Sequence, residues 1–242
     1  MKNLEPLLAK LMNFLAEKYK NQLVLKGGML LRLLDSTRAT QDLDYAWIRT
    51  KKKNIFAEEL KLSLESLIGI QVTRVDVNSR GIFLELLEQN SNLRAKLEIS
   101  VVKALHCSPK PMTTAPLSAP YSLKPHVVAT MDLSEAFSNK IAAALERHLA
   151  RDLYDLMILG RLTSFDEVTL RDRLSRLEIR RAKPKPVTPQ EAAVVLQKRI
   201  DSLTQETLKV ELTAHLSGES LEGMAMIIKS AVAKIVAQLE RL

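Results

Sequence analysis

Two aspartates separated by one residue are the side chains in this sequence best suited to chemistry. Asp42 and Asp44 lie in the segment Asp42-Leu43-Asp44. In an extended strand, side chains two positions apart project from the same face, so the two carboxylates are expected to lie side by side. Paired carboxylates repel each other and raise each other's pKa unless a cation lies between them. Hard divalent ions, Mg²⁺ above all, are the usual occupants and are often shared with substrate phosphates. The pair therefore predicts a metal site that serves phosphate chemistry.

A diglycine turn comes before this pair in the chain. Gly27 and Gly28 follow a short apolar run and open a helix-like segment that continues from Met29. A glycine turn at the N-terminus of a helix presents backbone N–H groups that can bind a phosphate. A phosphate-binding turn beside metal-binding carboxylates indicates nucleotide chemistry.

A third acid, Glu98, is placed to join the pair. Residues 93–102 alternate in polarity, and this alternation puts Lys96 and Glu98 on the polar face of a predicted strand. Acids on neighbouring strands can reach the same metals, and an in-line displacement assisted by two metal ions needs several oxygen ligands. The alternative is that all three acids are solvated, with Glu98 paired to Lys96 or Arg94 on the surface.

A second cluster of charged residues lies on a long predicted helix, residues 133–159. Its members are Lys140, Arg147, Arg151, Asp152 and Asp155. The three cations share one face if the helix is continuous. A row of cations there could hold a triphosphate and offset the charge that develops on leaving pyrophosphate. The alternative is an ordinary surface of ion pairs between successive helical turns.

Composition narrows the class of protein. The chain has 242 residues, a formal net charge of +8 and a pI near 9.5, which favours an anionic partner such as nucleic acid. The single cysteine, Cys107, excludes an internal disulfide and suits a reducing cytosol, so we expect a cytoplasmic protein. No run of about eighteen apolar residues occurs, so no membrane partner is expected. The charged N-terminal segment is unlike a signal peptide.

The order of elements predicts an α+β fold. We expect a small mixed sheet with helices in a domain of residues 1–125 and an α-helical domain of residues 126–242. Within the first, the pattern predicts helices at 4–19 and 54–67 and strands at 22–25, 42–48, 70–77, 82–87 and 93–102. Five prolines in residues 108–125 predict an irregular connection. Beyond the long helix, further helices are predicted at 165–177, 191–202, 205–216 and 221–242.

Taken together, the motifs resemble those of the AbiEii/AbiGii-type toxin nucleotidyltransferases, a family that includes the MenT toxins and belongs to the DNA polymerase β-like superfamily. The family pattern is a K-G-G-[TS] turn, a D-x-D strand, a K-[ILV]-[DE] strand, an acidic-x-x-x-x-K helix and R-x-x-x-R-D-x-x-D. The matching segments are, in order, Lys26-Gly27-Gly28, Asp42-Leu43-Asp44, Lys96-Leu97-Glu98, Glu135 to Lys140, and Arg147 with Arg151-Asp152 and Asp155. The resemblance covers roughly residues 20–160. One departure is Met29, where the family usually has Thr or Ser.

The resemblance implies roles for individual residues. The acids that would bind Mg²⁺ are Asp42, Asp44 and Glu98. The residues that would bind the nucleotide are Lys26, Gly27, Gly28, Lys140 and Arg151. Asp152 would orient or activate the acceptor hydroxyl, and the helical domain would complete the active-site cleft.

The resemblance also implies a function: transfer of a nucleoside monophosphate from an NTP to an acceptor hydroxyl, with release of pyrophosphate. In the resembled toxins the acceptor can be the 3′ end of tRNA, which stops growth, and a cognate antitoxin is the expected partner. The basic segment that contains Arg180, Arg181 and Lys183 could follow an RNA backbone. Two alternatives stay open. One is a small-molecule nucleotidyltransferase of the aminoglycoside-modifying type, and the other is a non-catalytic regulator that binds nucleotide or nucleic acid.

Overall fold

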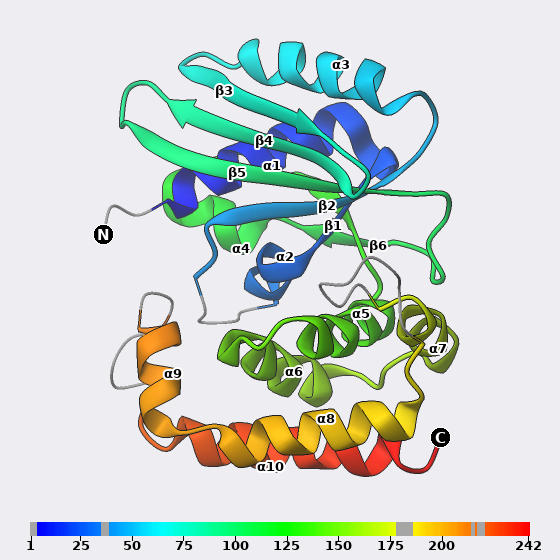
Figure 1. Ribbon diagram of the computed structural model, residues 1–242. Coiled ribbons are helices and arrows are strands. Elements are labelled where there is room, and N and C mark those ends of the chain that lie inside the picture. The colour runs from blue at the N-terminus through cyan, green and yellow to red at the C-terminus, as the bar shows by residue number, and fades with distance from the viewer. Residues whose placement is uncertain (1–3, 35–38, 178–185, 214–215, 217–220) are drawn as a thin grey trace. The chain divides into compact units, whose positions relative to one another are not determined.

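The computed structural model describes residues 4–34, 39–177, 186–213, 216 and 221–242. The chain divides into two compact units, Met1–Met131 and Asp132–Leu242. Figure 1 labels most of their helices and strands. The first unit holds every strand of the sheet, and the second is helical. This is the predicted α+β fold class, with a mixed sheet followed by helices.

A seven-stranded sheet organises the first unit (Figure 1). Its strands run in the order β3-β4-β5-β2-β1-β7-β6. The β2–β5 and β1–β7 pairs are parallel, and the remaining neighbours are antiparallel. The strands are β1 (Leu23–Lys26), β2 (Asp42–Ile48), β3 (Ile70–Val77), β4 (Gly81–Glu88), β5 (Leu93–Val102), β6 (Lys110–Thr113) and β7 (Val127–Thr130).

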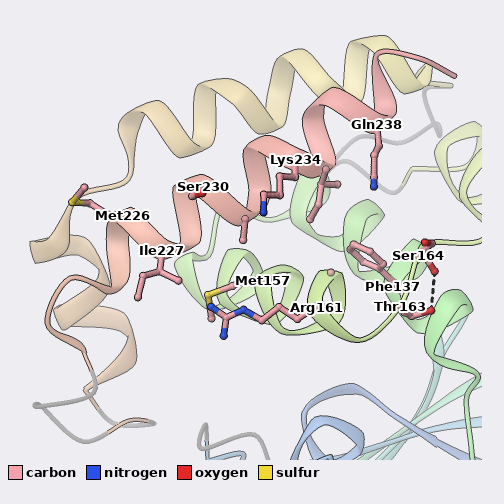
Figure 2. Close-up of a pocket in the computed structure, with 13 residues that line it drawn as sticks. Phe137, Met157, Arg161, Thr163, Ser164, Met226, Ile227, Ser230, Lys234 and Gln238 are labelled. Carbon is pink, nitrogen blue, oxygen red and sulfur yellow. Dashed lines mark hydrogen bonds between the residues drawn. The ribbon is translucent and has the colours of Figure 1, made fainter.

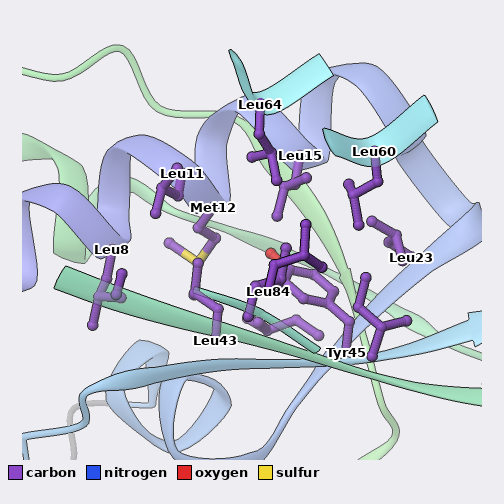
Figure 3. Close-up of a cluster of buried hydrophobic side chains, with 14 of the residues drawn as sticks. Leu8, Leu11, Met12, Leu15, Leu23, Leu43, Tyr45, Leu60, Leu64 and Leu84 are labelled. Atoms are coloured by element: carbon purple, nitrogen blue, oxygen red, sulfur yellow. The ribbon is translucent and has the colours of Figure 1, made fainter. Parts of the chain in front are cut away.

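The core of the first unit lies between one face of this sheet and two helices, α1 (Glu5–Tyr19) and α3 (Lys53–Glu65). Strand alternation sends every second side chain of β2 and β5 into that core. Figure 3 shows side chains of this core. They are Leu8, Leu11, Met12 and Leu15 of α1, Leu60 and Leu64 of α3, and Leu43, Tyr45 and Leu84 of the sheet. The same alternation leaves the acids of β2 and β5 on the opposite face.

The proline-rich connection contains more regular structure than predicted. Residues 108–125 include β6 and a short helix, α4 (Ala115–Ser118). Pro111 lies within β6, which is an edge strand of the sheet. An edge strand has one side without a partner, so a residue that lacks an N–H group is tolerated there.

The second unit consists of helices in its described part. They are α5 (Leu133–Glu146), α6 (Ala150–Leu162), α7 (Glu167–Ser175), α8 (Pro189–Ser202), α9 (Gln205–Leu212) and α10 (Met224–Leu239). The helix α10 packs along α8 and α6, while α5 packs on α6 and α7 (Figure 1). None of the described helices has the length and apolar character needed to cross a membrane.

The prediction of one continuous helix over residues 133–159 is wrong. The chain leaves helical geometry after Glu146, because Arg147 (φ −134°, ψ 136°) and Leu149 (φ −104°, ψ 131°) are extended. The helix therefore turns a corner between α5 and α6. As a result, the three cations expected on one helical face do not form a single row.

Candidate active site

The predicted strand acids lie in adjacent register on the face of the sheet opposite the core. In the aligned strands, Lys26 of β1 is opposite Asp44 of β2, and Asp44 is opposite Glu98 of β5. Neighbouring strands are about 4.8 Å apart. The backbone register therefore places a cation and two carboxylates in one line across three strands. Asp42 lies two residues before Asp44 on the same face of β2, opposite Lys96.

The diglycine turn touches this line of side chains directly. Gly27 follows β1 and begins the short helix α2 (Gly27–Leu33) in a left-handed conformation, with φ 68°. A Cβ atom built on Gly27 would lie 2.2 Å from Oδ2 of Asp44 and 2.8 Å from its Cβ. Only a glycine leaves room for the Asp44 carboxylate at this point. The glycine turn and the D-x-D strand are thus packed directly against each other.

The electrostatics of the acids follow from this placement. Glu98 is half-buried, and its pKa is raised from the ordinary value of 4.5 by burial first and then by the charges of Asp44 and Asp42. The cations Lys26 and Lys96 act in the opposite direction and lower that pKa. The carboxylates therefore lie close enough to repel one another, which is the condition that a bound cation relieves.

The carboxylate oxygens of Asp42, Asp44 and Glu98 are suitable ligands for magnesium, but they do not form a complete coordination site by themselves. Within the described ranges, no three His, Cys, Asp or Glu side chains converge into a group that could hold a metal ion. Asp42, Asp44 and Glu98 share a face without closing around a point. Magnesium, however, is usually bound by one or two carboxylates together with substrate phosphates and water. The residues fit a metal that arrives with a nucleotide.

The unusual Met29 points away from this chemistry. Its side chain is buried and belongs to the hydrophobic core. Gly28 beside it is also buried. The methionine at this position therefore contributes to packing behind the turn.

The charged cluster predicted in the second unit is an internal ion-pair network. Asp152 and Asp155 are 0% and 1% exposed. Lys140 lies 2.8 Å from Oδ2 of Asp155 and 3.4 Å from Oδ1 of Asp152. Arg147 donates from Nε and Nη2 to both oxygens of Asp152, at 3.0 and 3.2 Å. The corner between α5 and α6 thus brings Lys140 of α5 and Arg147 at its C-terminal end into contact with the aspartates of α6.

Two residues that sequence reasoning missed hold this corner. The buried Arg199 of α8 donates to the carbonyl oxygens of Ala144 and Leu149, the latter at 2.8 Å. Glu211 of α9 accepts from the backbone N–H of Ala150, at 2.5 Å. Burial lowers the pKa of Arg199, and the charges of Asp152 and Glu211 raise it again. An arginine in an amphipathic helix gives no sequence signal for such a role, because most arginines are exposed.

The remaining predicted residues are placed as follows. Arg151 lies at the start of α6 and is partly exposed, with no hydrogen bond or ion pair to other described residues. Arg180, Arg181 and Lys183 lie outside the described residues. The two sets of candidate residues therefore belong to different units, with the strand acids in the first and the ion-pair network in the second.

Each unit also contains a cavity. The one in the first unit has a volume of about 220 Å³, and its lining includes Lys96 and Glu98. The other, of about 490 Å³, lies among α5, α6 and α10 (Figure 2). Figure 2 shows Arg161 and Lys234 together with apolar side chains at its wall, and none of the predicted site residues line it. Of these two cavities, only the smaller is lined by one of the predicted strand acids, Glu98.

The fold has solved counterparts. The nucleotidyltransferase toxin MenT4 of Mycobacterium tuberculosis aligns with 99% of this chain and 83% of its own, at a TM-score of 0.62 and 18% identity. The JHP933 protein of Helicobacter pylori aligns with 98% of this chain and 92% of its own, at a TM-score of 0.56 and 19% identity. The fold is that of a nucleotidyltransferase.

The particular family follows from the sequence. Residues 11–235 match the family model of the nucleotidyl transferase AbiEii toxins of type IV toxin–antitoxin systems. The chain belongs to this family, so it is a toxin-type nucleotidyltransferase, as its motifs indicated. No curated protein matches it in sequence.

Proposed function

We propose that this nucleotidyltransferase transfers a nucleoside monophosphate from an NTP to the hydroxyl at the 3′ end of tRNA, with Mg²⁺ as cofactor, and that it thereby inhibits growth. The observation that carries the proposal is the line of Lys26, Asp44 and Glu98 across three strands, with Gly27 fitted against Asp44. The net charge of +8 supports a polyanionic acceptor.

On the donor side, we assign the triphosphate to the glycine turn. Lys26 supplies a positive charge, and the backbone at Gly27 and Gly28 can approach a phosphate closely because no side chain intervenes. Asp42 and Asp44 hold the magnesium, with Glu98 as the third acid. The metal, when bound, neutralises charge on the phosphate oxygens.

On the acceptor side, the tRNA hydroxyl oxygen bonds to the α-phosphorus as the bond to pyrophosphate breaks. The proton of that hydroxyl has to leave, and Glu98 can accept it. Proton transfer to a positioned carboxylate is a common form of general base catalysis. Glu98 therefore has two proposed roles. It is the third acid beside the metal-binding Asp42 and Asp44, and it accepts the proton of the acceptor hydroxyl.

In the second unit, we propose a positioning role for Asp152 in place of direct contact with the acceptor. Its carboxylate is fully buried; Oδ1 accepts from Lys140 and Arg147, and Oδ2 accepts from Arg147. Lys140 has three N–H donors, of which the two aspartates take two, so a third can bind a nucleotide phosphate. Arg151, which is partly exposed, is the second proposed phosphate contact.

The test is transfer of label from an α-labelled NTP to RNA. Each of the four NTPs is incubated with the protein, Mg²⁺ and total tRNA, and the products are separated on a denaturing gel. The proposal predicts labelled tRNA with wild type and at least a hundredfold less, as an order of magnitude, with Asp44→Asn. Absence of label with every NTP would refute it. Label on small molecules alone would identify the aminoglycoside-type alternative.

A second variant tests the RNA contact. The cations Arg180 and Arg181 are replaced by Gln together, and transfer to tRNA is measured at several salt concentrations. Phosphate contacts release counterions, so the double variant is expected to bind tRNA more weakly and with a shallower salt dependence. The KM for the NTP is expected to stay unchanged. An unaltered salt dependence would remove these residues from the RNA-binding surface.

A cognate antitoxin is the further proposed partner, in line with the toxin–antitoxin family to which the chain belongs. Growth after induction separates toxicity by catalysis from toxicity by binding. Asp44→Asn is expected to grow normally where wild type stops. Equal arrest by both proteins would favour a regulator that acts without chemistry.

A further inference from the structure

A half-buried phenylalanine stands on the polar face of the sheet. Phe83 lies in β4 between Ile82 and Leu84, which are both buried in the core. Alternation therefore directs Phe83 to the opposite face. It is absent from the partly buried apolar residues that pack against the core, and it lines the 220 Å³ cavity. Core packing does not account for it.

The register places this ring next to the catalytic acids. Phe83 is opposite Glu98 on one side and opposite Asp76 of β3 on the other. The line across the sheet therefore continues from Lys26 and Asp44 through Glu98 to Phe83. With strands about 4.8 Å apart, Phe83 lies about 10 Å from Asp44, and Glu98 lies between them.

Charged groups of both signs surround the ring in the cavity. Lys96 and Arg74 contribute N–H donors, while Asp76 and Glu85 contribute acceptors. Arg74 and Glu85 lie 3.8 Å apart and are largely exposed, so both can also meet a ligand. An aromatic face bordered by donors and acceptors suits a nucleobase, which stacks through its flat face and forms hydrogen bonds through its edge.

We propose that this cavity binds the base of the acceptor's terminal nucleotide, with Phe83 as its stacking surface. The inference rests on the proposed function, because it assumes an RNA acceptor. Attacking and leaving oxygens lie roughly in line in phosphoryl transfer. The triphosphate is assigned to Lys26 and the glycine turn, on one side of the acids. The acceptor must then approach from the other side, where Phe83 lies.

The experiment is a double-mutant cycle between protein and substrate. Wild type and Phe83→Ala are compared on a synthetic RNA with a free 3′ hydroxyl and on the same RNA whose terminal residue lacks its base. Loss of one stacked base is expected to raise the KM for the intact RNA about 5- to 100-fold. The KM for the NTP stays unchanged, and Phe83→Ala has no further effect on the abasic RNA. Phe83→Tyr keeps wild-type values, because it keeps the ring.

Controls separate the site from the fold and from the proposed reaction. Val75→Ala removes a partly exposed apolar side chain from the same hairpin and is expected to change neither KM. If Phe83→Ala melts early, Phe83→Leu keeps apolar volume without the ring and takes its place. Fluorescence anisotropy of the labelled RNAs without NTP measures the coupling between Phe83 and the terminal base from binding alone. This measurement therefore stays informative if the transfer reaction fails.

Three outcomes would overturn the inference. One is equal loss on intact and abasic RNA, which means that the ring does not contact the base. Another is a raised KM for the NTP alone, which would assign the cavity to the base of the nucleotide donor. The third is wild-type behaviour of Phe83→Ala with every substrate.

Discussion

Gly27 and Asp44 meet so closely that the identity of each constrains the other. We expect Gly27→Ala to lower the free energy of unfolding through two separate costs. A left-handed backbone with a Cβ costs about 1–2 kcal/mol, and displacing the Asp44 carboxylate adds about 1–3 kcal/mol. Urea denaturation measures the sum. Transfer activity is expected to fall with it, because Asp44 has to move.

Gly223 provides the matched control for this prediction. It has nearly the same backbone conformation, with φ 69°, but nothing lies within 4 Å of a Cβ added there. Gly223→Ala should therefore show the backbone cost alone and leave the transfer activity intact. Equal destabilisation by both variants would show that the Asp44 contact contributes nothing.

Glu98 carries a prediction about pH in metal-free buffer. Its pKa is raised in the folded protein, so its ionised form destabilises the fold. The penalty is absent below the ordinary glutamate pKa of 4.5 and is complete once the pH has risen through the raised value. Glu98→Gln is therefore expected to melt at a higher temperature than wild type at pH 7.5, and the difference is expected to vanish near pH 4.

Thermal melting with EDTA at a series of pH values measures this difference. The exposed Glu58→Gln is the control and is expected to match wild type throughout. A Glu98→Gln variant that melts below wild type at pH 7.5 would show that the Glu98 carboxylate is stabilised by its neighbours.

The sequence predicted which face of its strand each acid of the candidate site occupies. It did not predict which strands lie side by side, because strand pairing depends on long-range contacts. The shared face of Asp42 and Asp44 follows from strand period alone, and so does the polar face that carries Glu98. The opposition of Asp44 and Glu98 depends on the parallel pairing of β2 with β5, which no local pattern encodes. Phe83 was detectable in principle, because Ile82 and Leu84 on either side of it mark the core face.

At the scale of elements, the corner between α5 and α6 decides where the ion-pair network forms. Local pattern predicted one helix there because helical spacing continues across residues 147–149. Long-range contacts from Arg199 and Glu211 to the backbone of the corner favour the break. By contrast, β2 and β5 were predicted with their observed bounds, because alternation is a local property.

Arg199→Met tests the corner. Two backbone carbonyl groups lose a charged donor, so we expect a loss of about 2–4 kcal/mol in the free energy of unfolding. The exposed neighbour Lys198→Met is expected to change it by less than about 0.5 kcal/mol. Chemical denaturation measures both. Arg199→Met with wild-type stability would mean that the corner holds without α8.

At the scale of the whole molecule, the sequence patterns predicted the class of fold. A mixed sheet followed by helices was read from strand alternation, helical spacing and the change in character after the proline-rich segment. The boundary after residue 125 and the completion of a cleft by the second domain stay predictions. The position of one unit against the other is a property of long-range contacts, which residue patterns do not specify.

The central claim is that Asp42 and Asp44 hold a divalent metal beside the glycine turn. The most direct measurement is the anomalous scattering of Mn²⁺ in crystals grown with the metal and a non-hydrolysable NTP. The claim predicts a manganese peak in contact with both aspartates and with the triphosphate. A bound triphosphate whose manganese touches neither aspartate would contradict it.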